Sequence, residues 1–269
     1  MLDLTAKRVQ VMGILNVTPD SFSDGGRFHQ LDKALYHAEQ LINEGADIID
    51  IGGESTRPGS AGVTTDEELD RVIPLLQALR ERFEIAISID TSKAAVMKEA
   101  IAAKADMIND INALQASDAL AVCAASHIAI CLMHMQGEPR TMQHNPHYVD
   151  VVQEVSDFFK QRILACEKAG ITAERIVLDP GFGFGKSLDH NKDLLKQLNQ
   201  FEVFNRPILV GLSRKSMIGA WLGNKPIPER LQGSISAAVI AVMKGARIVR
   251  VHDVAATVDA LKIAQVILH

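Results

Sequence analysis

The sequence predicts an α/β fold: a closed barrel of eight parallel strands with a helix after each, the (β/α)8 or TIM barrel. Short β-branched apolar runs recur eight times along 269 residues, and segments with helical periodicity separate them. Eight such units in about 250 residues match the size of this barrel. A doubly wound sheet is the competing fold, but its Gly-x-Gly-x-x-Gly turn is missing after the first run. No linker divides the chain, so residues 1–269 are expected to form one domain.

The eight expected strands are apolar nearly throughout and turn polar only at their last positions, which is typical of parallel strands buried on both faces. They are residues 9–15, 47–52, 85–90, 106–111, 128–133, 175–179, 207–212 and 247–252. The segments between them, such as 31–45, 66–83 and 151–170, have apolar residues at helical spacing. Gly45 and Gly170 stand where two of these helices should end.

Composition excludes several classes of partner. Lys plus Arg is 28 and Asp plus Glu is 33, so the net charge of −5 argues against general binding to nucleic acid or to an anionic membrane surface. Aromatic residues are only 4% of the chain, too few for a base-stacking platform. The longest stretch without charged residues, 119–137, contains polar side chains and indicates a helix followed by a buried strand.

The cysteines and the N-terminus predict a cytoplasmic protein. Cys123, Cys131 and Cys166 lie in apolar surroundings without Cys-x-x-Cys spacing, so we expect buried free thiols in a reducing compartment. The first ten residues carry charges where a signal peptide would need an apolar core.

Nearly every expected strand ends in polar or glycine-rich residues, at the rim where such barrels build their active sites. These stretches are residues 13–26, 52–59, 90–92, 109–110, 134–136, 178–186, 211–219 and 250–253. Taken singly, each has a plain structural explanation: residues 90–92 could cap the next helix, and Phe182 and Phe184 could be packing residues. Their chemical variety at one rim favours a binding site.

Familiar catalytic motifs do not fit. Residues 181–187, GFGFGKS, lack the first glycine of a phosphate-binding P-loop, and residues 211–216, GLSRKS, lack the second glycine of a nucleophile elbow. His144 and His147 have no carboxylate or cysteine framework for zinc.

Positive charge is expected to gather after the seventh and eighth strands, where barrels of this class commonly bind phosphate. The residues there are Arg214, Lys215, Arg250 and His252. Arginine offers a forked set of donors to phosphate oxygens, so a phosphorylated or diphosphorylated ligand is predicted.

The barrel mouth should also accept hydrogen bonds. Strands 3, 4 and 6 contribute Asp90, Asn109 and Asp179 to the barrel mouth, and buried acceptors there would be satisfied by the N–H edge of a flat heterocycle. Four of the nine phenylalanines fall in or beside glycine-rich rim loops, where a flat substrate needs walls: Phe22, Phe28, Phe182 and Phe184.

Six segments carry a resemblance to a known family. They are GILNVTPDSFSDGG (13–26), GGESTRPG (52–59), LMHMQG (132–137), LDPGFGFGK (178–186), SRKSMIG (213–219) and RVHDV (250–254). In this order and spacing they resemble dihydropteroate synthase, over essentially the whole chain. The resemblance implies a TIM barrel that condenses p-aminobenzoate with 6-hydroxymethyl-7,8-dihydropterin diphosphate. The products would be 7,8-dihydropteroate and pyrophosphate, in folate biosynthesis.

The resemblance also implies residue roles. The pterin ring would be held by Asp90, Asn109, Asp179 and Lys215, with Asp179 on the 2-amino/N3 edge and Lys215 on the ring oxygen and N5 side. The diphosphate would be bound by Arg250 and His252, with a Mg²⁺ cofactor ligated by Asn16. The p-aminobenzoate pocket would be shaped by Thr56, Arg57, Phe184 and Ser216.

An aniline nitrogen is a weak nucleophile, so pyrophosphate is expected to leave before it attacks, in an SN1-like substitution through a cation delocalised into the pterin. Asp20 would stabilise this cation, and Arg57 and Lys215 complete the expected catalytic set. The first two rim loops are expected to close over the site and exclude water.

Two other functions stay open. A methyltetrahydrofolate-dependent methyltransferase domain resembles this family in its fold and pterin-holding residues, but would not need the rim cations or residues 18–22. A non-catalytic pterin-binding relative would keep the pocket, although the presence of Asn16, Asp20, Arg57 and Arg250 argues against it.

The sequence favours a homodimer. The helix expected at 233–245 is apolar on most sides, as is the last helix, so one face would be buried between subunits. Packing within the barrel explains part of this pattern, and the resembled family is commonly dimeric.

Overall fold

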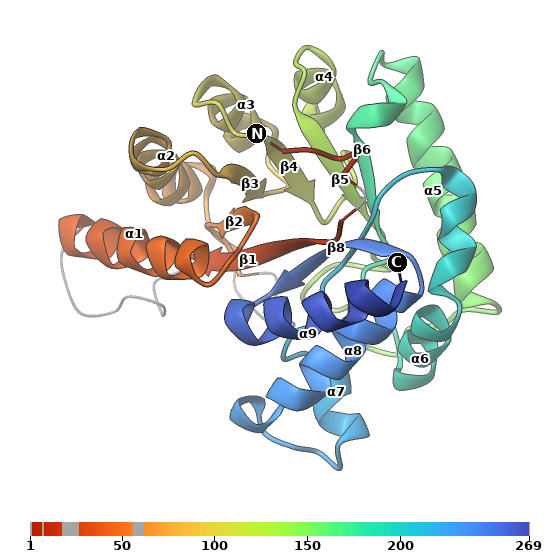
Figure 1. The fold of residues 1–269 in the computed structure, drawn as a ribbon. Helices are drawn as coiled ribbons and strands as arrows, with labels where there is room; N and C mark the ends of the chain where they lie inside the picture. Colours follow the sequence, from red (N-terminus) through yellow and green to blue (C-terminus); the bar gives the residue numbers. More distant parts are fainter. Residues whose placement is uncertain (1, 7, 18–26, 56–61, 269) are drawn as a thin grey trace.

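The structure is a computed structural model that describes residues 2–6, 8–17, 27–55 and 62–268. Eight parallel strands form one closed barrel in sequence order, with β8 pairing with β1 to complete it (Figure 1). They are β1 Gln10–Asn16, β2 Ile48–Gly52, β3 Ala86–Asp90, β4 Met107–Asp110, β5 Ala129–Met133, β6 Ile176–Asp179, β7 Ile208–Val210 and β8 Ala246–Val251. Each overlaps one expected run, so the predicted barrel is confirmed.

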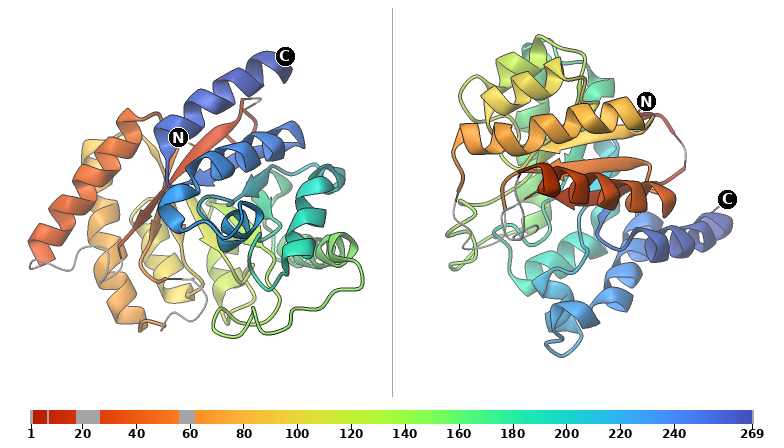
Figure 2. Two further views of the ribbon diagram at one scale, coloured as in Figure 1. Left: turned by 90° about the horizontal axis from the view of Figure 1, so that it is seen from below. Right: turned by 90° about the vertical axis from the view of Figure 1, so that its left-hand side faces the viewer.

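The helices surround the barrel as an outer ring (Figure 2). They are α1 Arg27–Asn43, α2 Thr65–Arg82, α3 Ala94–Ala102, α4 Ala119–Ala124, α5 Val151–Lys168, α6 Leu188–Lys196, α7 Ser216–Trp221, α8 Leu231–Met243 and α9 Val254–Leu268. Gly45 and Gly170 follow α1 and α5 with positive φ angles of 99° and 89°, so both expected helix ends are confirmed.

One connection departs from the expected repeat, because two helices, α7 and α8, lie between β7 and β8. The physical reason is a stop after α7: Gly223 and Asn224 both have positive φ, of 76° and 65°, which an α-helix cannot continue through. The chain then turns through a short 3-10 segment, Ile227–Glu229, before α8 begins.

Alternation along each strand sorts its side chains between two cores. In β2, Ile49 and Ile51 point outward and pack with the helices, whereas Ile48 points into the barrel. The inner cluster at the N-terminal end of the barrel, here named the apolar plug, consists of Met12, Ile48, Ala86, Met107, Ala129, Cys131, Val177, Leu209 and Ile248. Leu2 and Leu4 pack against the plug.

Other expectations can be checked directly. Cys123, Cys131 and Cys166 are buried and not in disulfides, as predicted. The uncharged stretch 119–137 forms α4 followed by the buried strand β5. Within the described part of the chain, no helix combines the length and apolar character needed to cross a membrane.

Candidate active site

Beyond the apolar plug, two residues further along most of the strands, the inward-facing side chains change from apolar to polar. This polar layer, on the side of the rim, consists of Asp50 on β2, Asp90 on β3, Asn109 on β4, Asp179 on β6 and Arg250 on β8. In β2, for example, Asp50 lies two residues beyond Ile48 and therefore faces the same interior. The structure thus brings together four of the residues predicted from sequence and adds Asp50.

Arg250 stands at the centre of the polar layer. Its Nε donates to Asp50 Oδ2 at 2.6 Å, and its Nη2 donates to Asp90 Oδ2 at 2.8 Å. Asn109 Nδ2 also donates to Asp50 Oδ2, at 3.3 Å. Asp90 therefore has a cationic partner within the protein, whereas the sequence analysis considered only the N–H groups of a ligand as its donors.

Asp50 was missed by the sequence analysis. It is fully buried, and its Oδ1 makes no hydrogen bond within the described residues. The signal was present, because Asp50 interrupts an apolar run at an inward position two residues before the strand ends at Gly52.

Burial and charge compete in this cluster. Burial raises the pKa of Asp90 to about 7; Arg250 opposes the rise, and Asp50 adds to it. Burial also disfavours the Arg250 cation, but Asp50 and Asp90 outweigh that effect and hold its pKa above the ordinary value. Arg250 therefore stays charged, while Asp90 titrates near neutral pH.

Asp179 occupies the opposite side of the layer and has a different environment. Its Oδ1 accepts from the backbone N–H of Gly181 at 2.8 Å, and no ion pair to it occurs among the described residues. Burial raises its pKa, and the positive charge of Lys215 opposes this shift. A buried carboxylate with one unused oxygen suits a ligand that donates N–H groups.

Lys215 and Phe184 lie beside Asp179. The Lys215 ammonium donates to the carbonyl of Phe182 and lies 4.6 Å from the centroid of the Phe184 ring. Burial lowers the pKa of Lys215 to about 8, although Asp179 opposes this shift. Phe184 is half-buried, whereas Phe182 is fully buried in the outer core and cannot be the pocket wall that was expected.

The cations after β7 and β8 are less available than the sequence suggested. Arg214 forms a two-point ion pair with Asp253, Nε to Oδ2 at 3.0 Å and Nη2 to Oδ1 at 2.5 Å. It therefore joins two rim loops. His252 is half-buried, and its Nδ1 lies 3.0 Å from the Oγ of Ser213. Ser216 is exposed as the first residue of α7.

Asn16 ends β1 at the rim. It is half-buried, and its Oδ1 lies 3.3 Å from the position that a Cβ would take on Gly52, the last residue of β2. Its amide oxygen is therefore at the same end of the barrel as the polar layer. Asp20, Thr56, Arg57 and Phe22 lie outside the described residues, as does the side chain of Phe28.

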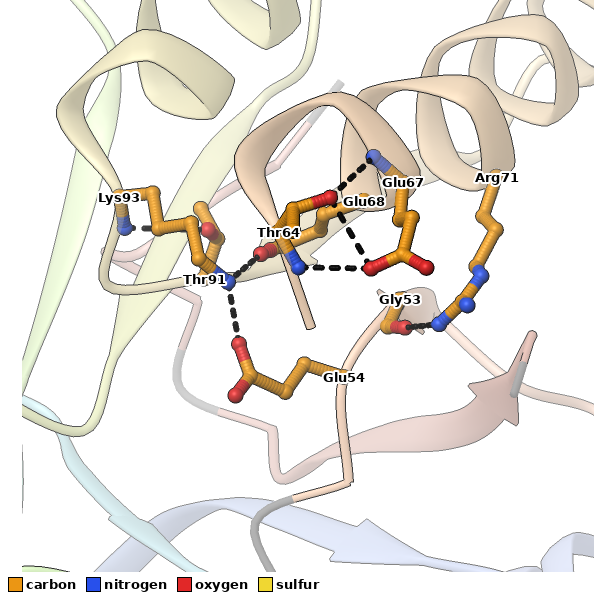
Figure 3. Close-up of polar contacts among 8 residues, drawn as sticks. All are labelled: Gly53, Glu54, Thr64, Glu67, Glu68, Arg71, Thr91 and Lys93. Atoms are coloured by element: carbon orange, nitrogen blue, oxygen red, sulfur yellow. Dashed lines mark hydrogen bonds and ion pairs between the residues drawn. The ribbon is translucent and has the colours of Figure 1, made fainter. Parts of the chain in front are cut away.

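A second charged cluster fixes the segment that follows β2 (Figure 3). The Lys93 ammonium binds Glu54 and also binds Glu68, which is 1% exposed, at 2.5 Å. Arg71 Nη1 donates to the carbonyl of Gly53 at 2.9 Å. Residues 90–92 do not cap α3, because its N-cap is Lys93, without a side-chain capping bond. Sequence reasoning missed this cluster, which depends on contacts between residues far apart in the chain.

The barrel, the polar layer and Lys215 beside Asp179 indicate the class of protein to which the chain belongs. The family described as pterin binding enzyme matches residues 12–252. A dihydropteroate synthase from Haemophilus influenzae is 56% identical over 98% of this chain and 95% of its own length. The chain therefore belongs to the dihydropteroate synthase family of pterin-binding enzymes.

Solved structures agree. The Xanthomonas albilineans dihydropteroate synthase with 4-aminobenzoic acid is 48% identical and superimposes with a TM-score of 0.92, covering 97% of this chain and 94% of its own. The Burkholderia cenocepacia enzyme complexed with 7,8-dihydropteroate is 50% identical with a TM-score of 0.89, covering 99% and 94%. The resemblance noted from the six motifs is thus confirmed.

Proposed function

We propose that this chain condenses p-aminobenzoate with 6-hydroxymethyl-7,8-dihydropterin diphosphate, giving 7,8-dihydropteroate and pyrophosphate in folate biosynthesis. The observation that carries the proposal is the polar layer, in which a buried, unpaired Asp179 lies beside Lys215 and faces a charged Arg250 network. That arrangement offers acceptors for the N–H edge of a pterin and cations for a diphosphate.

The pterin would lie in the polar layer. Asp179 would accept from the 2-amino group and N3, because its Oδ2 is not used by the backbone contact with Gly181. Asn109 and Asp90 would bind the facing edge, and Lys215 would donate to the ring oxygen and N5. Each contact between a charged side chain and a neutral partner contributes about 1.5–3 kcal/mol.

Arg250 and His252 would bind the leaving diphosphate. The Arg250 guanidinium uses Nε and Nη2 for Asp50 and Asp90, and these contacts orient the whole side chain. A positive charge fixed before the reaction stabilises the charge that develops as the C–O bond breaks. Because the aniline nitrogen is a weak nucleophile, bond breaking precedes its attack, and the pterin carries the transient positive charge.

A Mg²⁺ ion fits the proposed site. Among the described residues, no three His, Cys, Asp or Glu side chains converge in a way that would hold a metal by themselves. Asn16 offers one amide oxygen at the rim, and Mg²⁺ commonly binds through one or two protein oxygens together with substrate phosphates. When bound, the ion would supply neutralisation of the diphosphate charge.

The residues of the first two rim loops complete the proposed site. Asp20 would stabilise the pterin cation, and Thr56 and Arg57 would shape the p-aminobenzoate pocket with Phe184 and Ser216. We expect Arg57→Ala to lower turnover with little loss of pterin affinity, because its partner is the second substrate. Steady-state rates and calorimetric titration check this, and equal damage to both would place Arg57 against the pterin in the ground state.

Release of pyrophosphate tests the proposed reaction. The purified protein with Mg²⁺ and the pterin diphosphate should release pyrophosphate over repeated turnovers only when p-aminobenzoate is added, with one dihydropteroate formed per pyrophosphate. A non-catalytic pterin-binding protein would bind the pterin without releasing pyrophosphate. A methyltransferase domain would bind methyltetrahydrofolate instead, and either result would overturn the proposal.

We also propose a homodimer that pairs through α8 and α9. These helices lie side by side (Figure 1). They expose large apolar side chains: Ile240, Met243, Ile263, Val266 and Ile267. Large apolar side chains exposed on two neighbouring helices favour an interface between subunits. Light scattering at micromolar concentration should give twice the chain mass, and a monomer mass would contradict the proposal.

We propose a cytoplasmic location, which three buried free thiols support, because such thiols persist in a reducing compartment. Cell fractionation of the producing organism tests this directly.

A further inference from the structure

The loop between β6 and α6, residues 180–187, is built around a lysine that the proposed reaction does not use. Lys186 is 2% exposed, yet its ammonium has four polar neighbours. Nζ lies 2.9 Å from His134 Nδ1, 2.9 Å from Gly181 O, 3.0 Å from Phe184 O and 3.3 Å from His134 O. An ammonium has three protons, so the three shorter contacts satisfy it completely.

The His134 ring accepts one of the hydrogen bonds of the Lys186 ammonium. Burial, reinforced by the Lys186 charge, lowers the pKa of His134 to about 2, so the ring is neutral. Its Nδ1 then accepts from Lys186 and its Nε2 carries the proton. The ring is held in place by an edge-on contact with Phe158 at 4.9 Å between centroids and a tilted contact with Tyr148 at 6.1 Å.

The backbone of the loop is folded to point carbonyl groups at this ammonium. Gly181, Gly183 and Gly185 all have positive φ, of 69°, 78° and 60°. A Cβ on Gly181 would overlap the carbonyl of His134, so the loop presses closely on the end of β5. The alternating conformation sends the carbonyls of residues 181 and 184 inward to Lys186.

The other groups of the same loop contact the pterin-binding residues. The N–H of Gly181 donates to Asp179, and the carbonyl of Phe182 accepts from Lys215. The Phe184 ring lies under the Lys215 ammonium. The loop therefore has two sides: one binds Lys186, and the other sets the position of Asp179 and Lys215.

We propose that Lys186 is a positioning residue for the pterin site, acting by binding the inward carbonyls of the β6–α6 loop and so holding Asp179 and Lys215 in their binding geometry. This inference rests on the proposed function, which makes Asp179 and Lys215 the pterin-holding pair. Lys186 itself touches neither the substrates nor the reacting atoms.

Lys186 also acts on Asp179 through its charge. Burial lowers the pKa of Lys186 well below its ordinary value, and the charge of Asp179 opposes that shift. The three acceptors around Nζ, His134 Nδ1 and the carbonyls of Gly181 and Phe184, favour the ammonium form.

Burial raises the pKa of Asp179, and three cations around it, Lys215, Lys186 and Arg250, oppose that rise. The fourth titratable group facing it is the Cys131 thiol, whose pKa lies well above its ordinary value and which is therefore neutral. Removing the Lys186 charge raises the pKa of Asp179 further, so the carboxylate becomes protonated, and stops accepting N–H groups, at a higher pH.

The test is a calorimetric titration of Lys186→Gln with the pterin diphosphate, without p-aminobenzoate, from pH 5 to pH 8. Glutamine keeps hydrogen-bond donors for the carbonyls but removes the charge. We expect the acid limb of the affinity to move to higher pH, so that binding at pH 5 weakens more than binding at pH 8. At pH 8 the loss should be smaller and reflect geometry alone. The control is Lys192→Gln on α6, which removes the same charge from an exposed position paired with Asp189.

A second variant separates the effect of the loop's position from the effect of the Lys186 charge. His134→Asn keeps an acceptor near the place of Nδ1 and leaves Lys186 charged, so pterin affinity should fall about threefold at every pH with the acid limb unmoved. The inference is overturned if either variant only lowers the unfolding temperature and leaves the affinity and its pH dependence unchanged. If instead the wild type neither binds the pterin diphosphate nor releases pyrophosphate, the proposed function fails, which is a separate result.

Discussion

The two ends of the barrel interior are formed by the same strands but are lined by side chains of opposite polarity. At the N-terminal end the inward side chains form the apolar plug, whereas one alternation later they form the polar layer of Asp50, Asp90, Asn109, Asp179 and Arg250. The plug supplies stability by burying apolar surface, and the polar layer, as the proposed binding site, carries a cost in desolvated charge.

The effect of a substitution on stability and on binding should therefore depend on which end of the barrel interior it changes. A change in the plug should lower stability and spare binding, while a change in the polar layer should damage binding first. One residue should break this separation, because Arg250 is the proposed cation for the diphosphate and also pairs with two buried carboxylates.

Arg250→Met is therefore expected to have the largest effect of any single change. It removes the cation for the diphosphate, so kcat/KM for the pterin diphosphate should fall about a hundredfold or more. It also leaves Asp50 and Asp90 unpaired, which should lower the free energy of unfolding by about 3 kcal/mol. Urea unfolding and steady-state kinetics measure the two effects. The control is Arg247→Met, an exposed arginine on the same strand, and an equal loss there would mean that general charge matters instead.

Ile48→Ala should affect stability alone. Ile48 is 1% exposed in the plug, and its truncation should lower the free energy of unfolding by about 3 kcal/mol through lost contacts and a cavity. Ile48→Val should cost about 1 kcal/mol. Pterin affinity, measured by calorimetry below the unfolding temperature, should stay within about twofold. A large loss of affinity in the folded variant would show that the plug and the polar layer are coupled.

The pH dependence should distinguish the two ends of the barrel by a smaller effect, because the polar layer and the adjacent Lys215 contain groups that titrate near neutrality, whereas the apolar plug does not. Asp90 has a pKa raised to about 7, so below that pH it is protonated and releases Arg250. Lys215 has a pKa lowered to about 8, so above that pH it loses its charge. The profile of kcat/KM for the pterin diphosphate should be a narrow bell, and protonation of Asp90 and of Asp179 should both contribute to its acid limb. Lys215→Arg should abolish the alkaline limb at a lower overall rate, and an unmoved limb would assign it to another group.

Much of the fold followed from the sequence, because parallel strands buried on both faces leave continuous apolar runs such as 85–90 and 128–133. The presence of two helices, α7 and α8, between β7 and β8 did not follow from the sequence, because the positive φ angles of Gly223 and Asn224 are seen only in the folded backbone. Four members of the polar layer were predicted because they lie in polar stretches at or near the ends of the expected runs, as Asp179 does. Asp50 was missed because its role depends on which way it faces in the barrel.

The remaining parts of the site depend on distant partners. Lys186 and Lys93 are buried by contacts with other strands and loops, and a sequence shows only their charge. The same reason led to two errors: Arg214 was counted among the phosphate-binding cations before its partner Asp253 was known, and Phe182 was placed at the pocket wall although it packs in the outer core.

Asp179 is the one carboxylate of the polar layer without a cationic hydrogen-bond partner among the described residues, so the assignment of the pterin site depends on it most directly. Calorimetric titration of Asp179→Ala with 6-hydroxymethyl-7,8-dihydropterin diphosphate should show no detectable binding, while the free energy of unfolding is unchanged or higher. Retained affinity in this folded variant would contradict the assignment of the polar layer as the pterin site.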